Sequence, residues 1–262
     1  MIAGSPGLAR ADLLGVEVLD VPLADVTAAI VARPAGTPFG YVVTPNADHL
    51  ARLDAGDTTL ARCYAAAEAR VFDSRFLARV GRLLGTPMPR VVTGSDLTDA
   101  VLRAVPRDTP VTVIGTTAPA VTALRERFGL SEVDHLDLPF GFDPEAADIV
   151  DQALAHLRDR PATLVLLACG SPRQEILAHA IAAAGGTTGI GLCIGSAVDQ
   201  VGGHVRRAPH WLRATGFEWV WRILTEPRRL IPRYLKAFRA VVALHAARRP
   251  IVRQPTPTTP SS

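Results

Sequence analysis

Two polar segments of the sequence carry residue types that could take part in chemistry, and the first is TPNADHL, residues 44–50. Thr44 and Asn46 stand here at the end of an apolar stretch. Asn46 could cap the helix that follows, because asparagine is a favoured N-cap residue. It could equally, together with Thr44, hydrogen-bond a sugar or a nucleotide. The local pattern does not favour either interpretation over the other.

The second segment is RVFDSRFLARVGRLLG, residues 70–85, in which Asp73 follows a short apolar strand and precedes an amphipathic helix. Asp73 could serve as the N-cap of that helix, which would explain the residue fully. A carboxylate at the mouth of a sheet could instead accept the proton of a hydroxyl nucleophile and so act as a general base. Taken alone, the sequence favours the cap.

Two further segments combine a strand end, a glycine turn and a helix start, which is the arrangement that binds phosphate at helix N-termini. In RVVTGSDLT, residues 90–98, the N–H groups of Gly94 and Ser95 form such a candidate phosphate site, although many α/β loops share the pattern. ACGSPRQE, residues 168–175, has more polar content at one helix N-terminus: Gly170, Ser171, Arg173, Gln174 and Glu175.

Several families of site are disfavoured by what the sequence lacks. The glycine-rich segment GIGLCIGSAVDQVGG, residues 189–203, does not have the dinucleotide fingerprint, so NAD binding is not expected. There is no Asp-X-Asp triplet, Walker loop, HExxH or GxSxG motif, and the histidines do not cluster, so we expect neither a metal nor a cofactor. Cys63, Cys169 and Cys193 lie far apart, which fits a reducing cytoplasm rather than a disulfide framework or a zinc site.

The elements that would position these residues alternate between short apolar strands and helical patterns over the first ~200 residues. We therefore predict an α/β, Rossmann-like fold with a mostly parallel sheet and helices on both faces. The expected strands are 39–44, 90–93, 111–115, 133–136, 163–169 and 188–194, and the expected helices are 46–53, 95–104, 117–128, 143–158 and 172–184. Thr116 or Thr117, Pro144 and Ser171 would begin the last three of these helices. Ligands of such folds bind outside the carboxyl ends of the strands.

The charge distribution separates a body from a tail. From Arg206 onward there are twelve basic residues against two acidic ones, whereas the preceding chain has sixteen basic and 23 acidic residues. We predict a catalytic domain over residues 1–203, a basic amphipathic helical appendage over 204–253 and a disordered tail over 254–262. A tail of about +10 is expected to face something anionic, such as phosphate, nucleic acid or lipid headgroups.

Two alternatives for the tail follow from its composition. A nucleic acid would be attracted by the charge, but Trp211, Trp219 and Trp221 and their apolar neighbours fit a helix lying in a membrane interface better. No apolar stretch approaches the ~20 residues that a membrane span needs, and the first 30 residues have no signal-peptide pattern. We expect a cytoplasmic protein that binds peripherally to the inner face of the cell membrane, and no nucleic-acid partner.

Taken together, these segments resemble the WecG/TagA/CpsF glycosyltransferase family over about residues 14–238. The resemblance rests on TPNADHL, the Asp73 segment with its LLG, RVVTGSDL, CGSPRQE and IGSAVDQVGG. Most specific is RAPHWLRATGFEWVWRILTEPRRLIPRYL, residues 207–235. Two positions depart from the family pattern: Ser74 stands where the family usually has glycine, and Val198 where it often has an aromatic residue.

The resemblance implies an inverting, metal-independent transferase that moves a sugar from a UDP-sugar to an undecaprenyl-diphosphate-linked saccharide. N-acetylmannosamine, its uronic acid or glucose is the expected sugar, and a homo-oligomer is compatible with this function. Asp73 would be the catalytic base, and Arg206, Arg207 and Arg213 would bind the donor diphosphate. The residues expected at the substrate are Thr44, Asn46, Gly94, Ser95, Gly170, Arg173, Gln174 and Glu175. A noncatalytic nucleotide sensor is the rival function that the fold also allows, and it leaves Asp73 without a role.

Overall fold

The computed structural model describes residues 8–13 and 15–203, six helical positions between 220 and 238, and residues 252–253. The strands are β1 (Arg10–Leu13), β2 (Val16–Leu19), β3 (Gly40–Val43), β4 (Ala69–Arg70), β5 (Val111–Gly115), β6 (Val133–Leu136), β7 (Leu164–Ala168), β8 (Ile190–Cys193) and β9 (Val252–Arg253). The helices within residues 8–203 are α1 (Leu23–Val31), α2 (Ala47–Asp54), α3 (Thr58–Ala66), α4 (Arg75–Leu83), α5 (Gly94–Ala104), α6 (Ala118–Phe128), α7 (Ala147–Asp159), α8 (Arg173–Ala184) and α9 (Ala197–Val201).

A six-stranded sheet forms the centre of the fold, in the order β4-β3-β8-β7-β5-β6. Every pairing in this sheet is parallel, which confirms the predicted Rossmann-like α/β architecture. Strands buried on both faces read as continuous apolar runs, and β5 and β8 are buried along their whole length. All six strands therefore end at the same edge of the sheet, where their carboxyl ends can share a ligand.

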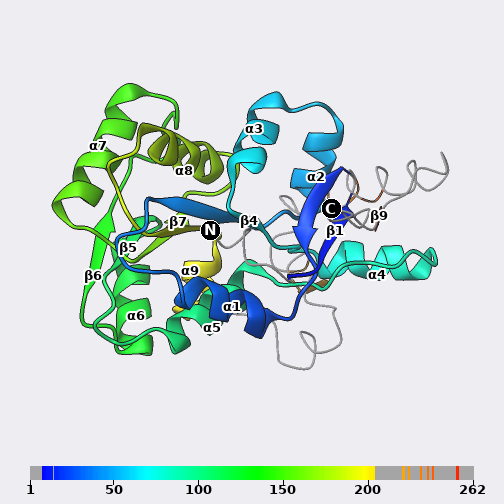
Figure 1. Cartoon of the computed structure of the whole chain (residues 1–262), viewed down its shortest axis with the longest axis horizontal. Coiled ribbons are helices and arrows are strands. Elements are labelled where there is room, and N and C mark those ends of the chain that lie inside the picture. The colour runs from blue at the N-terminus through cyan, green and yellow to red at the C-terminus, as the bar shows by residue number, and fades with distance from the viewer. Residues whose placement is uncertain are drawn as a thin grey trace, which may run out of the picture.

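Helices cover both faces of the sheet (Figure 1). Helices α3, α7 and α8 lie over one face, and α1, α5, α6 and α9 lie over the other. Successive residues of a strand point to opposite faces, so β3 sends Tyr41 and Val43 into the first hydrophobic core and Val42 into the second. With a packed core on either side, the sheet gives the loops at its carboxyl edge a rigid base.

The sequence placed most of these elements within a few residues, but three assignments were wrong. Residues 90–93 form no strand: they are an extended loop tied to the sheet edge by the hydrogen bond from Val92 N to Phe72 O, at 2.9 Å. Helix α7 begins at Ala147 rather than at Pro144, because residues 143–146 form a turn instead. Ser171 does not cap its helix, because Pro172 is the N-cap residue of α8. Thr117 is the N-cap residue of α6, as predicted, although its side chain makes no capping hydrogen bond.

A small antiparallel sheet, which the alternating pattern did not predict, joins the two ends of the described chain in the order β2-β1-β9. Strand β9 pairs with β1 through Asp12 opposite Arg253 and Leu13 opposite Val252. The end of the basic appendage thus returns to the N-terminal hairpin. None of the helices in the described part of the chain is long and apolar enough to cross a bilayer.

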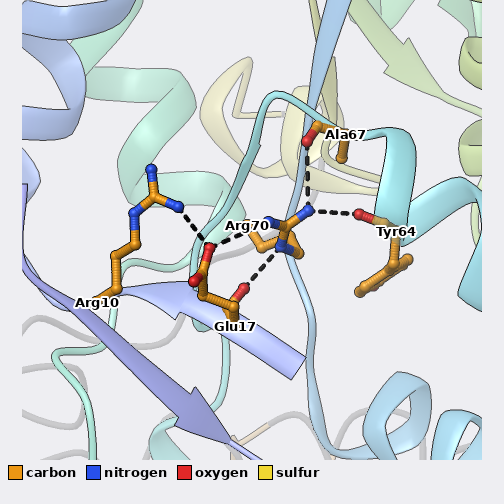
Figure 2. Close-up of polar contacts among 5 residues, drawn as sticks. All are labelled: Arg10, Glu17, Tyr64, Ala67 and Arg70. Carbon is orange, nitrogen blue, oxygen red and sulfur yellow. Dashed lines mark hydrogen bonds and ion pairs between the residues drawn. The ribbon is translucent and has the colours of Figure 1, made fainter. Parts of the chain in front are cut away.

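Arg70 fastens the hairpin to the main sheet (Figure 2). Its guanidinium donates to the backbone oxygen of Glu17 at 2.7 Å and to that of Tyr64, at the end of α3, at 2.6 Å. The Glu17 carboxylate lies 3.5 Å from Arg70 and 2.5 Å from Arg10. A single guanidinium therefore holds together β2, β4 and the C-terminal turn of α3.

Candidate active site

A cavity of about 610 Å³ opens at the carboxyl edge of the sheet. Its walls come from the loops after β3, β4, β7 and β8 and from the first turns of the helices that follow them. The sequence-predicted residues that line it are Thr44, Asn46, Asp73, Ser95, Gly170 and Gln174. A size of several hundred cubic ångströms is typical of sites for nucleotide-sized ligands.

Asp73 does not cap α4, contrary to the interpretation that the sequence alone favoured. Ser74 is the N-cap residue, and its hydroxyl accepts a hydrogen bond from Leu77 N at 3.1 Å. Asp73 Oδ2 instead accepts the N–H of Gly94 at 3.1 Å, and its own N–H donates to Pro45 O at 2.8 Å. The serine that departs from the family pattern therefore provides the cap, and Asp73 is held at the cavity wall between the β3 and α5 loops.

The same contact changes the predicted phosphate site. Gly94 N–H points to the Asp73 carboxylate, so it is not the open phosphate donor that the sequence predicted. Thr93 is the N-cap residue of α5 and accepts from Asp96 N at 3.1 Å. Ser95 lies at the cavity wall, but most of its surface is buried.

Asn46 and Thr44 follow β3 directly. Asn46 is the N-cap residue of α2, and its Oδ1 accepts from Asp48 N at 3.0 Å and His49 N at 3.4 Å. The side chain also lines the cavity, so the cap and the ligand-binding interpretations are compatible in one geometry. Thr44 donates its hydroxyl to Cys193 O at 2.9 Å, which ties the end of β3 to β8.

Gln174 joins two walls of the cavity. Its Oε1 accepts from Gly195 N at 2.8 Å, and its Nε2 donates to Glu175 Oε1 at 2.8 Å. Glu175 is fully buried beneath this contact, and burial raises the pKa of its carboxyl. Neither Glu175 nor Arg173 lines the cavity; Arg173 donates to Phe142 O at 3.1 Å and fastens the loop after β6. The structure therefore gives these two residues supporting positions rather than the predicted contacts with substrate.

Several lining residues were not singled out from the sequence. Asp48 and His49 belong to the quoted segment 44–50, and Asp199 belongs to the glycine-rich segment 189–203, whereas Phe140 lies where nothing in the pattern indicated a site. Asp199 accepts the hydroxyl of Thr116 at 2.6 Å, and Thr116 has a φ of 58°, which is strained for a β-branched residue. Phe140 is fully exposed at the cavity rim.

The cysteines do not supply a nucleophile. Cys169 lines the cavity, but burial raises the pKa of its thiol to about 12. Burial also raises the pKa of Cys63 to about 11 and that of Cys193 well above its usual value. Because the thiolate is the reactive form, these thiols are inert near neutral pH.

Within the described residues no group of three or more His, Cys, Asp or Glu is arranged to hold a metal ion.

The carboxylates at the cavity outnumber the cations. Asp48, Asp73 and Asp199 line it, whereas Arg75 is the cation among the described lining residues and pairs with Asp96 at 2.5 Å. The arginines predicted to bind a diphosphate, Arg206, Arg207 and Arg213, lie outside the described residues.

A known protein family matches almost the entire chain. A family model described as the glycosyl transferase WecG/TagA/CpsF family matches residues 11–254, from β1 through the basic region to β9. The match includes the cavity, the loop that carries Asp73 and the C-terminal region that the sequence motifs indicated. The chain belongs to the WecG/TagA/CpsF glycosyltransferase family.

Proposed function

We propose that this glycosyltransferase moves a sugar, with inversion, from a UDP-sugar to an undecaprenyl-diphosphate-linked saccharide, and that Asp73 is the catalytic base. Family membership supplies the coarser part: a glycosyltransferase of cell-surface polysaccharide synthesis that uses a nucleotide-sugar and a lipid-linked acceptor. Nucleotides bind at the carboxyl edge of parallel sheets, so the position of the cavity supports a donor in which the sugar is attached to a nucleotide.

The observation that carries the proposal is the position of the Asp73 carboxylate. Ser74 caps α4, so Asp73 is not needed there, and the Gly94 N–H fixes the carboxylate at the cavity wall. A general base must first have the right geometry, and a carboxylate that the Gly94 N–H holds at the wall of a ligand-sized cavity supports that role.

The reaction that fits is a single displacement. The acceptor hydroxyl attacks the anomeric carbon, its proton passes to Asp73, and the bond between that carbon and the β-phosphate oxygen breaks so that UDP leaves. One new C–O bond replaces one old C–O bond on the opposite face of the sugar, which inverts the configuration. The sugar passes to the acceptor oxygen, the proton of that hydroxyl passes to Asp73, and the electron pair of the broken C–O bond leaves with UDP.

The leaving diphosphate needs positive charge that the described cavity does not supply, because three carboxylates face it and Arg75 is already paired. Part of the need is met by the N-terminus of α8: unlike α2, α4 and α5, this helix has no side-chain capping hydrogen bond. Its dipole favours an anion beside Gly170, although the N–H of Gln174 already donates to Gly170 O at 3.1 Å. We assign the remaining positive charge to Arg206, Arg207 and Arg213 in the basic appendage.

The appendage is also proposed to hold the protein on anionic membranes. Leu224, Ile231, Leu235 and Phe238 are helical and have exposed side chains, and the last three have the spacing of one helix face. Apolar groups of this kind among many basic residues are typical of interfacial helices.

We expect the full-length protein to float with vesicles that contain anionic lipid and to stay in solution with neutral ones. Equal flotation with both, or with neither, would contradict electrostatic membrane binding.

Donor choice is tested by release of the nucleotide. With a lipid-linked acceptor, we expect UDP-sugars to react and GDP- or CMP-sugars to react at least ~10-fold more slowly. UDP-N-acetylmannosamine, its uronic acid and UDP-glucose are the first donors to assay, on the basis of the family. Preference for a GDP- or CMP-sugar would refute the donor.

Turnover should persist in excess EDTA, as the lack of an Asp-X-Asp triplet suggests.

Stabilisation of the protein by oligonucleotides but not by UDP, measured by thermal shift, would instead favour a nucleic-acid function.

A further inference from the structure

Gln174 lies in the first turn of α8 and lines the cavity, although only 2% of the residue is exposed. Its backbone is tied on both sides: the N–H donates to Gly170 O at 3.1 Å, and the carbonyl accepts from Cys193 Sγ at 3.6 Å. These contacts connect the first turn of α8 to the loop after β7 and to the end of β8. The side chain of Gln174 therefore starts from a fixed backbone position.

The orientation of the Gln174 amide follows from two short side-chain contacts. A backbone N–H can only donate, so the atom that faces Gly195 N at 2.8 Å is the amide oxygen Oε1. The amide nitrogen Nε2 can only donate, and it does so to Glu175 Oε1 at 2.8 Å. A flipped amide would set two donors against each other at Gly195 and lose that hydrogen bond.

Both partners of this amide are themselves held in place. Glu175 is fully buried and does not line the cavity, so its carboxyl does not reach a ligand there. Burial raises the pKa of this carboxyl, but a protonated acid keeps a carbonyl oxygen and can accept from Gln174 as an ionised one does. Gly195 has a φ of 55°, a left-handed conformation that glycine adopts without strain.

One donor of Gln174 remains for a ligand. The residue offers a backbone N–H, a backbone carbonyl, Oε1 and the two protons of Nε2; in the described part of the chain, all but the second Nε2 proton have a partner. The loop that holds the amide also borders the proposed base, because a methyl group added to Gly94 would lie 3.4 Å from Asp73 Oδ2 and 3.6 Å from Ile194 O. The remaining proton is therefore placed on the side of the cavity where the reaction is proposed to occur.

We propose that Glu175 is a positioning residue: together with the Gly195 N–H it locks the amide of Gln174 so that Nε2 donates to an oxygen of the nucleotide-sugar beside the bond that breaks. The inference rests on the proposed function, which supplies the nucleotide-sugar. The oxygen belongs to the β-phosphate or to the sugar, and both are acceptors of the same kind. An amide held through both of its polar atoms needs no reorganisation when the substrate binds.

A double-mutant cycle separates positioning from general support of the fold. Glu175→Met removes the acceptor and keeps a side chain of similar length, so the Gln174 amide should lose its orientation and kcat/KM should fall by ~10–100-fold. Glu175→Gln keeps an oxygen that can accept from Nε2 and should retain kcat/KM within about threefold of wild type. In the Gln174→Ala background, Glu175→Met should have almost no further effect, because the group through which it acts is gone. An undiminished loss in that background, or a Glu175→Gln variant as impaired as Glu175→Met, would overturn the proposal.

Glu68→Met is the matched control, because Glu68 is another largely buried carboxylate, paired with Arg33 at 2.6 Å, and does not line the cavity. It should lower the temperature of thermal unfolding and leave kcat/KM within about twofold of wild type. A loss of kcat/KM as large as that of Glu175→Met would show that destabilisation alone explains both.

Titration with UDP alone and with UDP-N-acetylmannosamine identifies the oxygen that Gln174 binds. Glu175→Met should weaken the binding of both ligands if the oxygen belongs to the β-phosphate, and of the sugar nucleotide alone if it belongs to the sugar. Wild-type affinity of Glu175→Met for both ligands would contradict a contact with the donor.

The contact between Gln174 and Glu175 is measured without any assay of transfer. The sequence has four glutamines and one asparagine, so ¹H–¹⁵N spectra of the full-length protein should contain few side-chain NH₂ signals, and Gln174→Ala identifies the one of interest. Without ligand, that signal should move in Glu175→Met and stay in Glu68→Met. The signal of Gln152, which is exposed on α7, should move in neither.

A Gln174 signal that does not respond to Glu175→Met would overturn the inference even if the enzyme transfers sugar as proposed. Conversely, if no nucleotide-sugar reacts, the proposed function fails while the ligand-free spectrum still decides whether Glu175 holds the amide.

Discussion

Replacing Asp73 by asparagine is expected to lower kcat by ~10²–10⁴-fold, the usual contribution of a general base. Asparagine has the same shape, and its side-chain oxygen can still accept the Gly94 N–H, but it cannot take the proton of the acceptor hydroxyl. The fold should be unaffected, because Ser74 and not Asp73 caps α4. Initial rates of UDP release and thermal unfolding of the same preparations measure the two quantities.

Asp99→Asn provides the control for this substitution. Asp99 pairs with Arg103 at 2.7 Å along α5 and does not line the cavity, so its loss should cost ~0.5 kcal/mol of stability or less and leave kcat within twofold. Transfer by Asp73→Asn at close to the wild-type rate would show that another group accepts the proton.

Replacing Arg206, Arg207 and Arg213 together by alanine is the second change expected to have a large effect. If these side chains neutralise the leaving diphosphate, kcat/KM for the donor should fall by at least ~10²–10³-fold, the cost of removing even one charge-stabilising donor. The affinity for UDP alone should fall as well, because the same charges hold the product. Calorimetric titration with UDP and steady-state rates at varied donor concentration measure both effects.

Its matched control removes the same net charge from the body. Arg103, Arg125 and Arg127 lie on α5 and α6, contact Phe128, Asp99 or nearby backbone, and do not line the cavity. Alanine at these three positions should leave UDP affinity within about twofold. If both triple variants bind UDP equally well, the appendage arginines do not contact the diphosphate. Point substitutions are preferable to truncation after Gly203, since truncation also removes β9, the strand that pairs with β1.

The sheet was predictable from the sequence because its strands are buried on both faces. β5 was placed to the residue, since 111–115 is a largely apolar run bounded by turn residues. The bounds of β6 also matched, although Leu136 is the buried residue of this edge strand. The short hairpin of β1 and β2 escaped notice because a four-residue alternation such as Val16–Leu19 is too brief to be distinguished from a loop. Residues 90–93 look like a strand, but they lie past the edge strand β4 and make no ladder.

The site was predictable as a set of loops but not as a network. Sequence pattern identified Asp73 and Asn46 because each stands at the junction of a strand and a helix. It favoured Asp73 as the cap of α4, whereas Ser74 caps this helix: both are favoured cap residues, and the choice depends on the Gly94 N–H, 21 residues away. His49 was overlooked for a related reason: its partner Tyr64 is on another helix, and no local spacing connects them.

The anomeric configuration of the product is the measurement that tests the central claim most directly. The purified full-length enzyme would be given an α-linked UDP-sugar and a lipid-linked acceptor, and the new linkage would be read by NMR from its one-bond C1–H1 coupling. Direct displacement with Asp73 as the base predicts a β-linkage, formed by wild type and not by Asp73→Asn. An α-linkage, which requires two displacements or a different geometry of attack, would contradict the account.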